Sequence, residues 1–450
     1  MRRQLKIFFS TPRPLRLCSE KKRKSNFEMA CLLPLVLFLL ALNACRTYAP
    51  PSVTRQDLAE YYQTDRTKLL KPDYAVFNIT DSMSRLYFSV KSSELLYSKT
   101  ANDADYTAHM LLQYIVHPVN LARVIVDSGS VVMNDVGQTA DKSLLSFVDM
   151  DIYPQDHFYI ELVFRDLNKN IASSELLYLD HSGRNAHNNF LLTSPKIESP
   201  LFREYVKPNE QFSLRANDDL GKQLTVHYYR NTYGPALPPY SFSKPGVITT
   251  PDSSWQILND DDQTLSFSRE GFYQIQDQNG LGNGFTISVF DDGYPEITSA
   301  EQLVYPLRYL TTKQEYIAMD TAKDQKAAVD AFWLSCCSSQ DRARIVIKYY
   351  YNRVAAANTL FTSEKEGWKT DRGMIYVLFG PPSNVFKTAE EETWMYGSDM
   401  GGGSLTFIFD RSTADTFSNE DLILERNESM NVIWIQAVDS WRQGHAYNVQ

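Results

Sequence analysis

The sequence predicts a multidomain protein: two tandem antiparallel β-sandwich modules of the immunoglobulin-like kind, followed by an α+β domain. Short segments that alternate between apolar and polar residues run from residue 73 to residue 298, as is typical of sandwiches. Aromatic residues are abundant, with 27 Tyr and 24 Phe, and they favour strands. After residue 298 the pattern changes to longer segments with helical spacing.

The two β modules are expected at residues 73–187 and 188–298. In the first, segments such as 85–90 (RLYFSV) alternate with a period of two, and turn residues separate them. In the second, Pro- and Gly-rich turns such as 233–235 (YGP) separate similar segments. Each module has the size of one sandwich, about 100 residues. No internal repeat supports a duplication, and the strand topology stays open.

The C-terminal region, residues 299–450, is expected to begin with helices at 300–310, 313–333 and 340–360. The last of these places Ile345, Tyr349, Arg353 and Ala356 on one face. A small sheet should follow, made of the segments 374–379, 392–396, 405–410 and 431–438. The whole region therefore predicts an α+β domain.

One stretch of this region, residues 367–382 (GWKTDRGMIYVLFGPP), stands out. Residues 371–373 have turn chemistry, because Asp can bond its own backbone and Gly accepts positive φ. Residues 374–379 are apolar at every position, which predicts a strand buried on both faces. The Gly-Pro-Pro of residues 380–382 would end that strand, since proline donates no ladder hydrogen bond.

This stretch resembles the signature of the GWxTD domain family, found in exported lipoproteins of Bacteroidota. The resemblance covers residues 326–435. Its candidate signature or partner-binding residues are Gly367, Trp368, Thr370, Asp371, Arg372, Gly373, Tyr376, Gly380, Pro381, Pro382, Trp394 and Tyr396. The family has no established reaction, so the resemblance implies a domain and an exported protein but no catalytic residue and no cofactor.

The N-terminus reads as a lipoprotein signal peptide over residues 1–44. A basic stretch precedes an apolar run of about 14 residues, which is shorter than the roughly 20 needed for a membrane-spanning helix. The run ends in LNAC at Cys45, which resembles a lipobox, so Cys45 is the predicted lipidation (palmitate) site. The alternatives are an uncleaved anchor and a cleaved, soluble protein. Residues 45–72 are expected to form a tether and a short helix over 57–70.

The same N-terminal residues predict a location. Arg46 follows the cysteine where an acidic residue would favour retention in the inner membrane, and surface-export acidic residues are missing from 46–53. By resemblance to known lipoproteins, this favours the periplasmic face of the outer membrane. The long basic stretch leaves the true translation start open.

Charge argues against one class of partner. Without residues 1–44 the chain has 36 Lys and Arg against 52 Asp and Glu, a formal charge of −16. Such a surface repels phosphate backbones, so nucleic acid is not an expected partner. The acyl chain, and not surface charge, would have to hold the membrane.

Candidate chemistry is sparse. The adjacent Cys336 and Cys337 are either two thiols or a strained vicinal disulfide, and they make no credible metal site alone. No HExxH, GxSxG or P-loop occurs. The acidic run 390–392 together with Asp371 offers carboxylates for glycoside hydrolysis, but a solvated acidic turn is the simpler interpretation. Glycines 401–403 precede a strand and not a helix, which argues against a phosphate cradle.

The resulting hypothesis is a non-enzymatic periplasmic lipoprotein without cofactors, anchored in the outer membrane through Cys45. It would act as a binding or scaffold component with a protein partner, in an envelope assembly or secretion complex. The alternative is a glycan-binding or glycan-processing protein that uses carboxylates and aromatics of the C-terminal domain. A buried signature favours the first hypothesis, and a cleft with converging carboxylates favours the second.

Overall fold

The structure is a computed structural model that describes most of the chain after residue 56. The described ranges are 57–63, 70–101, 104–121, 123–137, 141–154, 156–195, 199–217, 220–230, 233–243, 250–260, 263–278, 284–388, 390–397, 404–411, 417–418 and 421–447. The predicted signal peptide, the predicted lipidation site Cys45 and the glycines 401–403 lie outside the described residues. Within these ranges, no helix is both long and apolar enough to cross a membrane.

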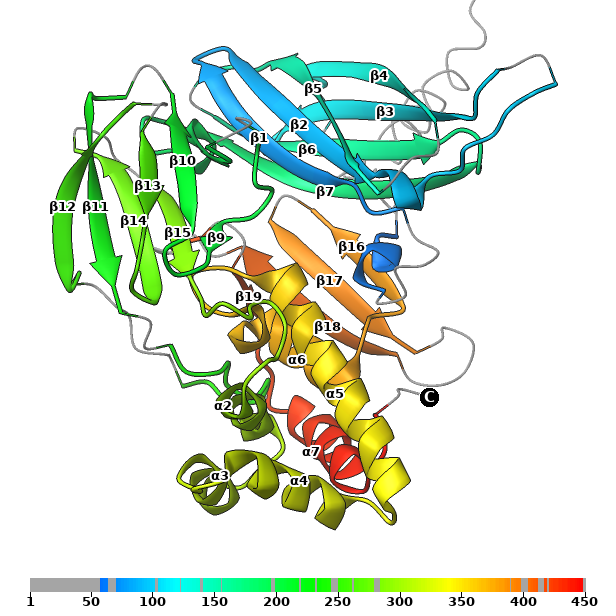
Figure 1. Cartoon of the computed structure of the whole chain (residues 1–450), viewed down its shortest axis with the longest axis vertical. Helices are drawn as coiled ribbons and strands as arrows, with labels where there is room; N and C mark the ends of the chain where they lie inside the picture. The colour runs from blue at the N-terminus through cyan, green and yellow to red at the C-terminus, as the bar shows by residue number, and fades with distance from the viewer. Residues whose placement is uncertain are drawn as a thin grey trace, which may run out of the picture. The chain divides into compact units, whose positions relative to one another are not determined.

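The described part of the first β region forms two antiparallel sheets (Figure 1). One has the strand order β1 (Asp73–Thr80), β2 (Met83–Lys91), β5 (Ser143–Asp151). The other has the order β4 (Asp127–Val136), β3 (Thr107–Pro118), β6 (Asp156–Asp166), β7 (Ile171–His181). Alternate residues of β3 are buried, as the strand period requires, and both sheets contribute to one apolar cluster.

The second β region also contains two sheets within its described residues. The smaller has the order β13 (Thr264–Ser266), β10 (Gln211–Ala216), β8 (Phe190–Thr193). The larger has the order β12 (Ser253–Leu258), β11 (Gln223–Tyr229), β14 (Gly271–Asp277), β15 (Phe285–Val289), β9 (Tyr205–Val206). The β9–β15 pair is parallel and the other pairs are antiparallel. The predicted β-rich character of residues 73–298 is confirmed.

The C-terminal region combines helices with a sheet. The helices are α2 (Ala300–Val304), η4 (Tyr305–Tyr309), α3 (Lys313–Asp320), α4 (Gln325–Cys336), α5 (Gln340–Phe361), η5 (Gly367–Lys369), α6 (Asp371–Phe379) and α7 (Met430–Arg442). The sheet has the order β16 (Asn384–Lys387), β17 (Glu391–Tyr396), β18 (Leu405–Arg411), β19 (Leu422–Leu424). Capping boxes begin α2 and α3, at Ser299 and Thr312. The prediction of helices followed by a sheet is confirmed in this coarse form.

The predicted strand over residues 374–379 is wrong, because these residues belong to helix α6. Every residue of α6 is buried, so its sequence shows no amphipathic period and resembles a buried strand. The boundaries carry the helical signals instead. Thr370 caps the N-terminus, and Gly380 follows the C-terminus with φ of 85°.

Two further helix predictions need correction. Residues 431–438 lie in α7 and not in the sheet, and Trp434, Ala437 and Trp441 form its buried stripe. The predicted face of α5 is also wrong, since Ile345 is 70% exposed and Tyr349 is 47% exposed. The buried stripe of α5 is instead Ala343, Val346, Tyr350, Arg353, Val354, Ala357 and Phe361.

The predicted helix over residues 57–70 reduces, in its described part, to the single 3₁₀ turn η1 (Ala59–Tyr62). Leu58 and Tyr62 are buried in the same apolar cluster as Trp333, Trp394 and Trp441 of the C-terminal region. This described segment is therefore part of the C-terminal core.

Candidate functional site: the signature segment

The candidate site is built around the start of α6. The Thr370 hydroxyl accepts a hydrogen bond from the Gly373 N–H (3.0 Å) and donates one to the Gly367 carbonyl (2.8 Å). Threonine at this position satisfies a backbone donor that the first helical turn leaves unpaired. One side chain therefore fixes both the helix start and the preceding turn η5.

The glycines of the signature permit close backbone packing. A Cβ on Gly373 would overlap the carbonyl oxygen of Gly367, and a Cβ on Gly367 would overlap the carbonyl oxygen of Ala357 in α5. Neither glycine has a positive φ in this structure, so the requirement is space and not backbone conformation. The two glycines let η5 lie directly between α5 and α6.

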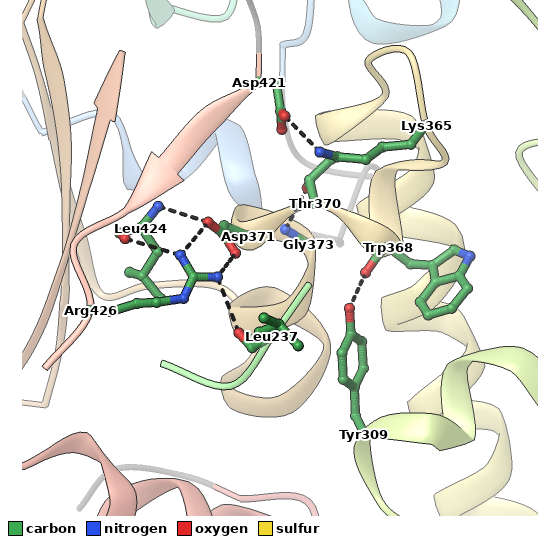
Figure 2. A network of polar contacts seen from close by, with 10 residues as sticks. All are labelled: Leu237, Tyr309, Lys365, Trp368, Thr370, Asp371, Gly373, Asp421, Leu424 and Arg426. Carbon is green, nitrogen blue, oxygen red and sulfur yellow. Dashed lines mark hydrogen bonds and ion pairs between the residues drawn. The ribbon is translucent and has the colours of Figure 1, made fainter. Parts of the chain in front are cut away.

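Trp368 is only 5% exposed and is fixed through its backbone (Figure 2). Its N–H donates to the Asn358 side-chain oxygen (3.1 Å), and its carbonyl accepts from the Tyr309 hydroxyl (2.9 Å). The indole also meets the Tyr309 ring edge-on, with centroids 5.8 Å apart. Trp368 thus joins α5, η5 and η4 in the core.

Asp371 forms a buried ion pair with Arg426, which follows β19 (Figure 2). The Arg426 guanidinium donates to both carboxylate oxygens, at 2.6 and 3.1 Å, and the Leu424 N–H donates to Oδ2 at 2.9 Å. Arg426 also donates to the Leu237 carbonyl (3.2 Å) in the second β region. Burial raises the pKa of Asp371 above its ordinary value, although the charge and hydrogen bonds of Arg426 act against that rise.

Arg372 forms a second buried ion pair, with Glu392 of β17 at 3.0 Å. The same carboxylate accepts hydrogen bonds from the Tyr62 hydroxyl (2.5 Å) and the Trp394 indole N–H (2.7 Å). Burial alone would raise the pKa of Glu392, but the charges of Lys387 and Arg372 and these hydrogen bonds hold it below its ordinary value. Glu392 is therefore a fully engaged carboxylate.

Lys365, just before the signature, pairs with Asp421 (Figure 2) and also lies close to Glu364. Its ammonium is 2.6 Å from Asp421 and 3.4 Å from Glu364. Burial raises the pKa of Glu364, and the neighbouring Asp421 raises it further. Two cations, Lys365 and Arg426, thus compensate three carboxylates, which are Glu364, Asp371 and Asp421.

The end of α6 is fixed by residues of α5 and β17. Arg353 donates to the carbonyls of Val377 (3.2 Å) and Leu378 (3.0 Å), which have no partner within the helix. A side chain on Gly380 would meet the Arg353 guanidinium, and the Tyr396 hydroxyl donates to the Gly380 carbonyl (2.8 Å). Pro382 is buried and Pro381 is half-buried beyond this point.

The structure does not bring the signature carboxylates into an open cleft. Glu390 and Glu391 are exposed, as a solvated turn requires, whereas Glu392 is buried, so that prediction was wrong for Glu392. The cavity that reaches Arg372 and Glu392 has a volume of about 30 Å³, which suits one or two water molecules and not a sugar. Among the described residues, this arrangement joins elements of the fold and leaves only this small cavity beside Arg372 and Glu392.

The two adjacent cysteines and the candidate metal-ligand side chains are the remaining groups to consider. Cys336 and Cys337 are both free thiols, and burial raises the pKa of each. Within the described ranges, no group of three or more His, Cys, Asp or Glu side chains is placed to hold a metal ion.

Several partners of the signature were not found from the sequence. They are Tyr62, Asn358, Glu364, Lys365, Lys387, Asp421 and Arg426. Tyr62, Asp421 and Arg426 come from segments distant in sequence, and no local pattern marks the contacts of the nearer residues. The single usable signal was the excess of charged residues next to an apolar core segment, because buried charges need partners.

Comparison with known protein families identifies the region around the signature. Residues 271–443 match the family model described as the GWxTD domain, so this part of the chain forms a GWxTD domain. The match begins at β14, inside the region expected to be the second β module. A search of curated proteins gave no match.

Solved structures give weak likenesses. The BSP domain of a biofilm-associated protein is 9% identical over 52% of this chain and 54% of its own, with a TM-score of 0.16. A C-terminal 282-residue fragment of intimin, in complex with the intimin-binding domain of its translocated receptor, is 7% identical. The match covers 57% of this chain and 78% of the fragment, with a TM-score of 0.16. Escherichia coli α2-macroglobulin activated by porcine elastase is 12% identical. The match covers 49% of this chain and 23% of the macroglobulin, with a TM-score of 0.11. These scores do not support a shared fold.

Proposed function

We propose that the protein is a non-enzymatic lipoprotein of the Bacteroidota type, anchored to the periplasmic face of the outer membrane through Cys45. It acts as a binding or scaffold component of an envelope assembly or secretion complex. The two β regions, as tandem immunoglobulin-like sandwiches, provide spacing and binding surfaces, and the GWxTD domain organises the chain around them.

The observation that carries this proposal is the burial of the signature. Trp368, Thr370, Asp371, Arg372 and Gly373 all face other parts of the same chain. Catalytic carboxylates need access to a substrate and a pKa suited to proton transfer. The carboxylates of Asp371 and Glu392 are instead each paired with an arginine inside the fold.

The glycan alternative receives no comparable support. Sugar recognition through aromatic platforms requires exposed ring faces, whereas the rings of Trp368, Tyr376, Trp394 and Tyr396 are buried. We therefore favour a protein partner, bound by surfaces outside the signature.

The anchor is tested by metabolic labelling of the full chain with an alkyne analogue of palmitate in a Bacteroidota host. The wild type and a Cys337→Ala control should incorporate label and fractionate with the outer membrane. Cys45→Ala should do neither. Labelling of Cys45→Ala, or its retention in the membrane fraction, would remove the anchor from the proposal.

The scaffold role is tested by proximity labelling in the intact envelope, with a peroxidase fused to the C-terminus and with biotin-phenol and hydrogen peroxide added to the cells. A defined set of envelope proteins should be enriched for the wild type and lost for Cys45→Ala. If the labelled set matches that of an unrelated periplasmic fusion, the scaffold role is wrong. Specific retention of the purified protein on cell-wall glycan would favour the alternative.

A further inference from the structure

The segment Asp57–Gln63 lies far from the GWxTD domain in sequence but is embedded in it. Tyr62 is 1% exposed. Its ring stacks on Phe361 of α5, with centroids 5.7 Å apart, and lies 5.3 Å from the Trp394 ring of β17. Its hydroxyl donates to the buried Glu392. Tyr62 thus fills a position in the core of the domain.

The backbone of the segment is held as well. The Leu58 N–H donates to the Val385 carbonyl (2.8 Å), and the Val385 N–H donates to Asp57 Oδ1 (2.8 Å). The Asn384 side chain donates to Asp57 Oδ2 (2.8 Å). Both Asn384 and Val385 belong to β16, the edge strand of the sheet. One backbone hydrogen bond and two bonds to the Asp57 carboxylate therefore tie the segment to the edge strand of the sheet.

The carbonyl groups of the segment also have partners. The Tyr376 hydroxyl of α6 donates to the Tyr62 carbonyl (2.7 Å). Lys71, at the start of the first β region, donates to the carbonyls of Tyr61 (2.9 Å) and Gln63 (2.7 Å). A segment held by its ring, its backbone and both neighbouring regions is a fixed part of the domain.

We propose that Asp57–Gln63 is a plug through which the lipid anchor holds the GWxTD domain next to the membrane. The inference rests on the proposed function, because it takes Cys45 to be lipidated. Cys45 precedes Asp57 by 12 positions. Because an extended chain spans at most about 3.5 Å per residue, the domain is held within about 40 Å of the anchor. The GWxTD domain is therefore membrane-proximal, although it lies far from Cys45 in the sequence.

The test separates the plug from the anchor with two full-length variants. One carries a specific protease site in place of residues 48–53, and the other in place of residues 64–69. Both proteins are cut in outer-membrane fragments opened by sonication, where the protease reaches the periplasmic face, and the fraction released from the membranes is measured. The first cut severs all links to Cys45 and should release the protein. The second cut leaves residues 45–63 docked, so the protein should stay bound until urea is added.

Each outcome has a distinct meaning. If the first cut releases nothing, the lipid anchor is wrong and both proposals fail. If both cuts release the protein without urea, the anchor stands and the plug alone is overturned. In the variant with the protease site at residues 64–69, adding Tyr62→Ala should increase release after the cut about tenfold or more. A loss of about 1.4 kcal/mol or more of docking free energy has this effect.

Two more substitutions, made in the variant that carries the protease site at residues 64–69, control for misfolding. Asp57→Ala removes hydrogen bonds to β16 from an exposed side chain, leaves the core intact and should also increase release. Glu60→Ala alters an exposed side chain of the same turn and should release no more protein than its parent. Equal release from the parent, Asp57→Ala and Glu60→Ala would overturn the plug.

Discussion

Arg426 binds both carboxylate oxygens of Asp371, and through this pair the GWxTD signature is joined to the end of its own sheet. The same guanidinium reaches the Leu237 carbonyl in the second β region. One half-buried cation therefore links α6, the segment after β19 and a loop of the neighbouring β region.

Removing one member of this pair should be costly. Asp371→Ala leaves the guanidinium of Arg426 buried without its partner, which we expect to lower the free energy of unfolding by about 3–5 kcal/mol. The measurement is urea unfolding followed by tryptophan fluorescence. Asp371→Leu combined with Arg426→Leu should cost less than the sum of the single changes. Additive effects would contradict a direct pair.

A methyl group at Gly373 should be poorly tolerated. It would overlap the Gly367 carbonyl oxygen, so η5 and α6 would have to separate. We expect Gly373→Ala to lose about 3 kcal/mol or more of stability in thermal unfolding. Gly234→Ala is the matched control, because its Cβ would meet no atom within 4 Å. Similar melting temperatures for the two variants would be inconsistent with close packing here.

The Glu315–Arg442 pair should make a pH-dependent contribution. The hydrogen bond from Arg442 lowers the pKa of Glu315 from 4.5 to about 2 in the folded protein. The pKa of Glu315 is lower in the folded than in the unfolded protein, so ionised Glu315 stabilises the folded state at pH values above the unfolded pKa. This contribution is lost as the pH falls from about 4.5 toward 2. Because both side chains are about one-third exposed, we expect less than about 1 kcal/mol.

The check is Glu315→Gln, which can still complete the capping box with Thr312. Urea midpoints of the variant and the wild type should differ at pH 7 and converge toward pH 2. A constant difference across this range would assign the effect to the cap and not to the ion pair.

Cys336 and Cys337 should be isolated as two thiols. Burial raises the pKa of both, so alkylation of the folded protein at neutral pH should be slow. After denaturation without reductant, peptide mass mapping should find both residues alkylated. A peptide that resists alkylation and is lighter by two hydrogens would instead indicate a vicinal disulfide.

The sequence predicted the type of an element correctly where its apolar residues fitted only the period of a strand or only the period of a helix. Strands with one buried face, such as β3, alternate visibly, and α5 has helical spacing throughout. Its buried face was misjudged because both neighbouring stripes, one through Tyr349 and one through Tyr350, are apolar enough to qualify.

The strand predicted over 374–379 shows where pattern fails. A segment buried on all sides loses the period that separates helix from strand, so only its ends remain informative. Thr370 before the segment and Gly380 after it are helix-boundary residues, but residues 371–373 were interpreted as a turn and residues 380–382 as the end of a strand. The ion pairs of the site lay beyond local pattern altogether, since Arg372 and Glu392 meet only through tertiary packing.

The place of Tyr62 also constrains how the chain can fold. Tyr62 and Glu392 are separated by 330 positions, and ribosomes make the tyrosine first. This core residue of the GWxTD domain therefore cannot reach its native partner until β17 has been made. Contacts of such long range are slow to form, and the waiting aromatic segment is exposed to aggregation. Nascent chains that stop before β17 should thus be clients for chaperones, whatever the state of their completed β-sheets.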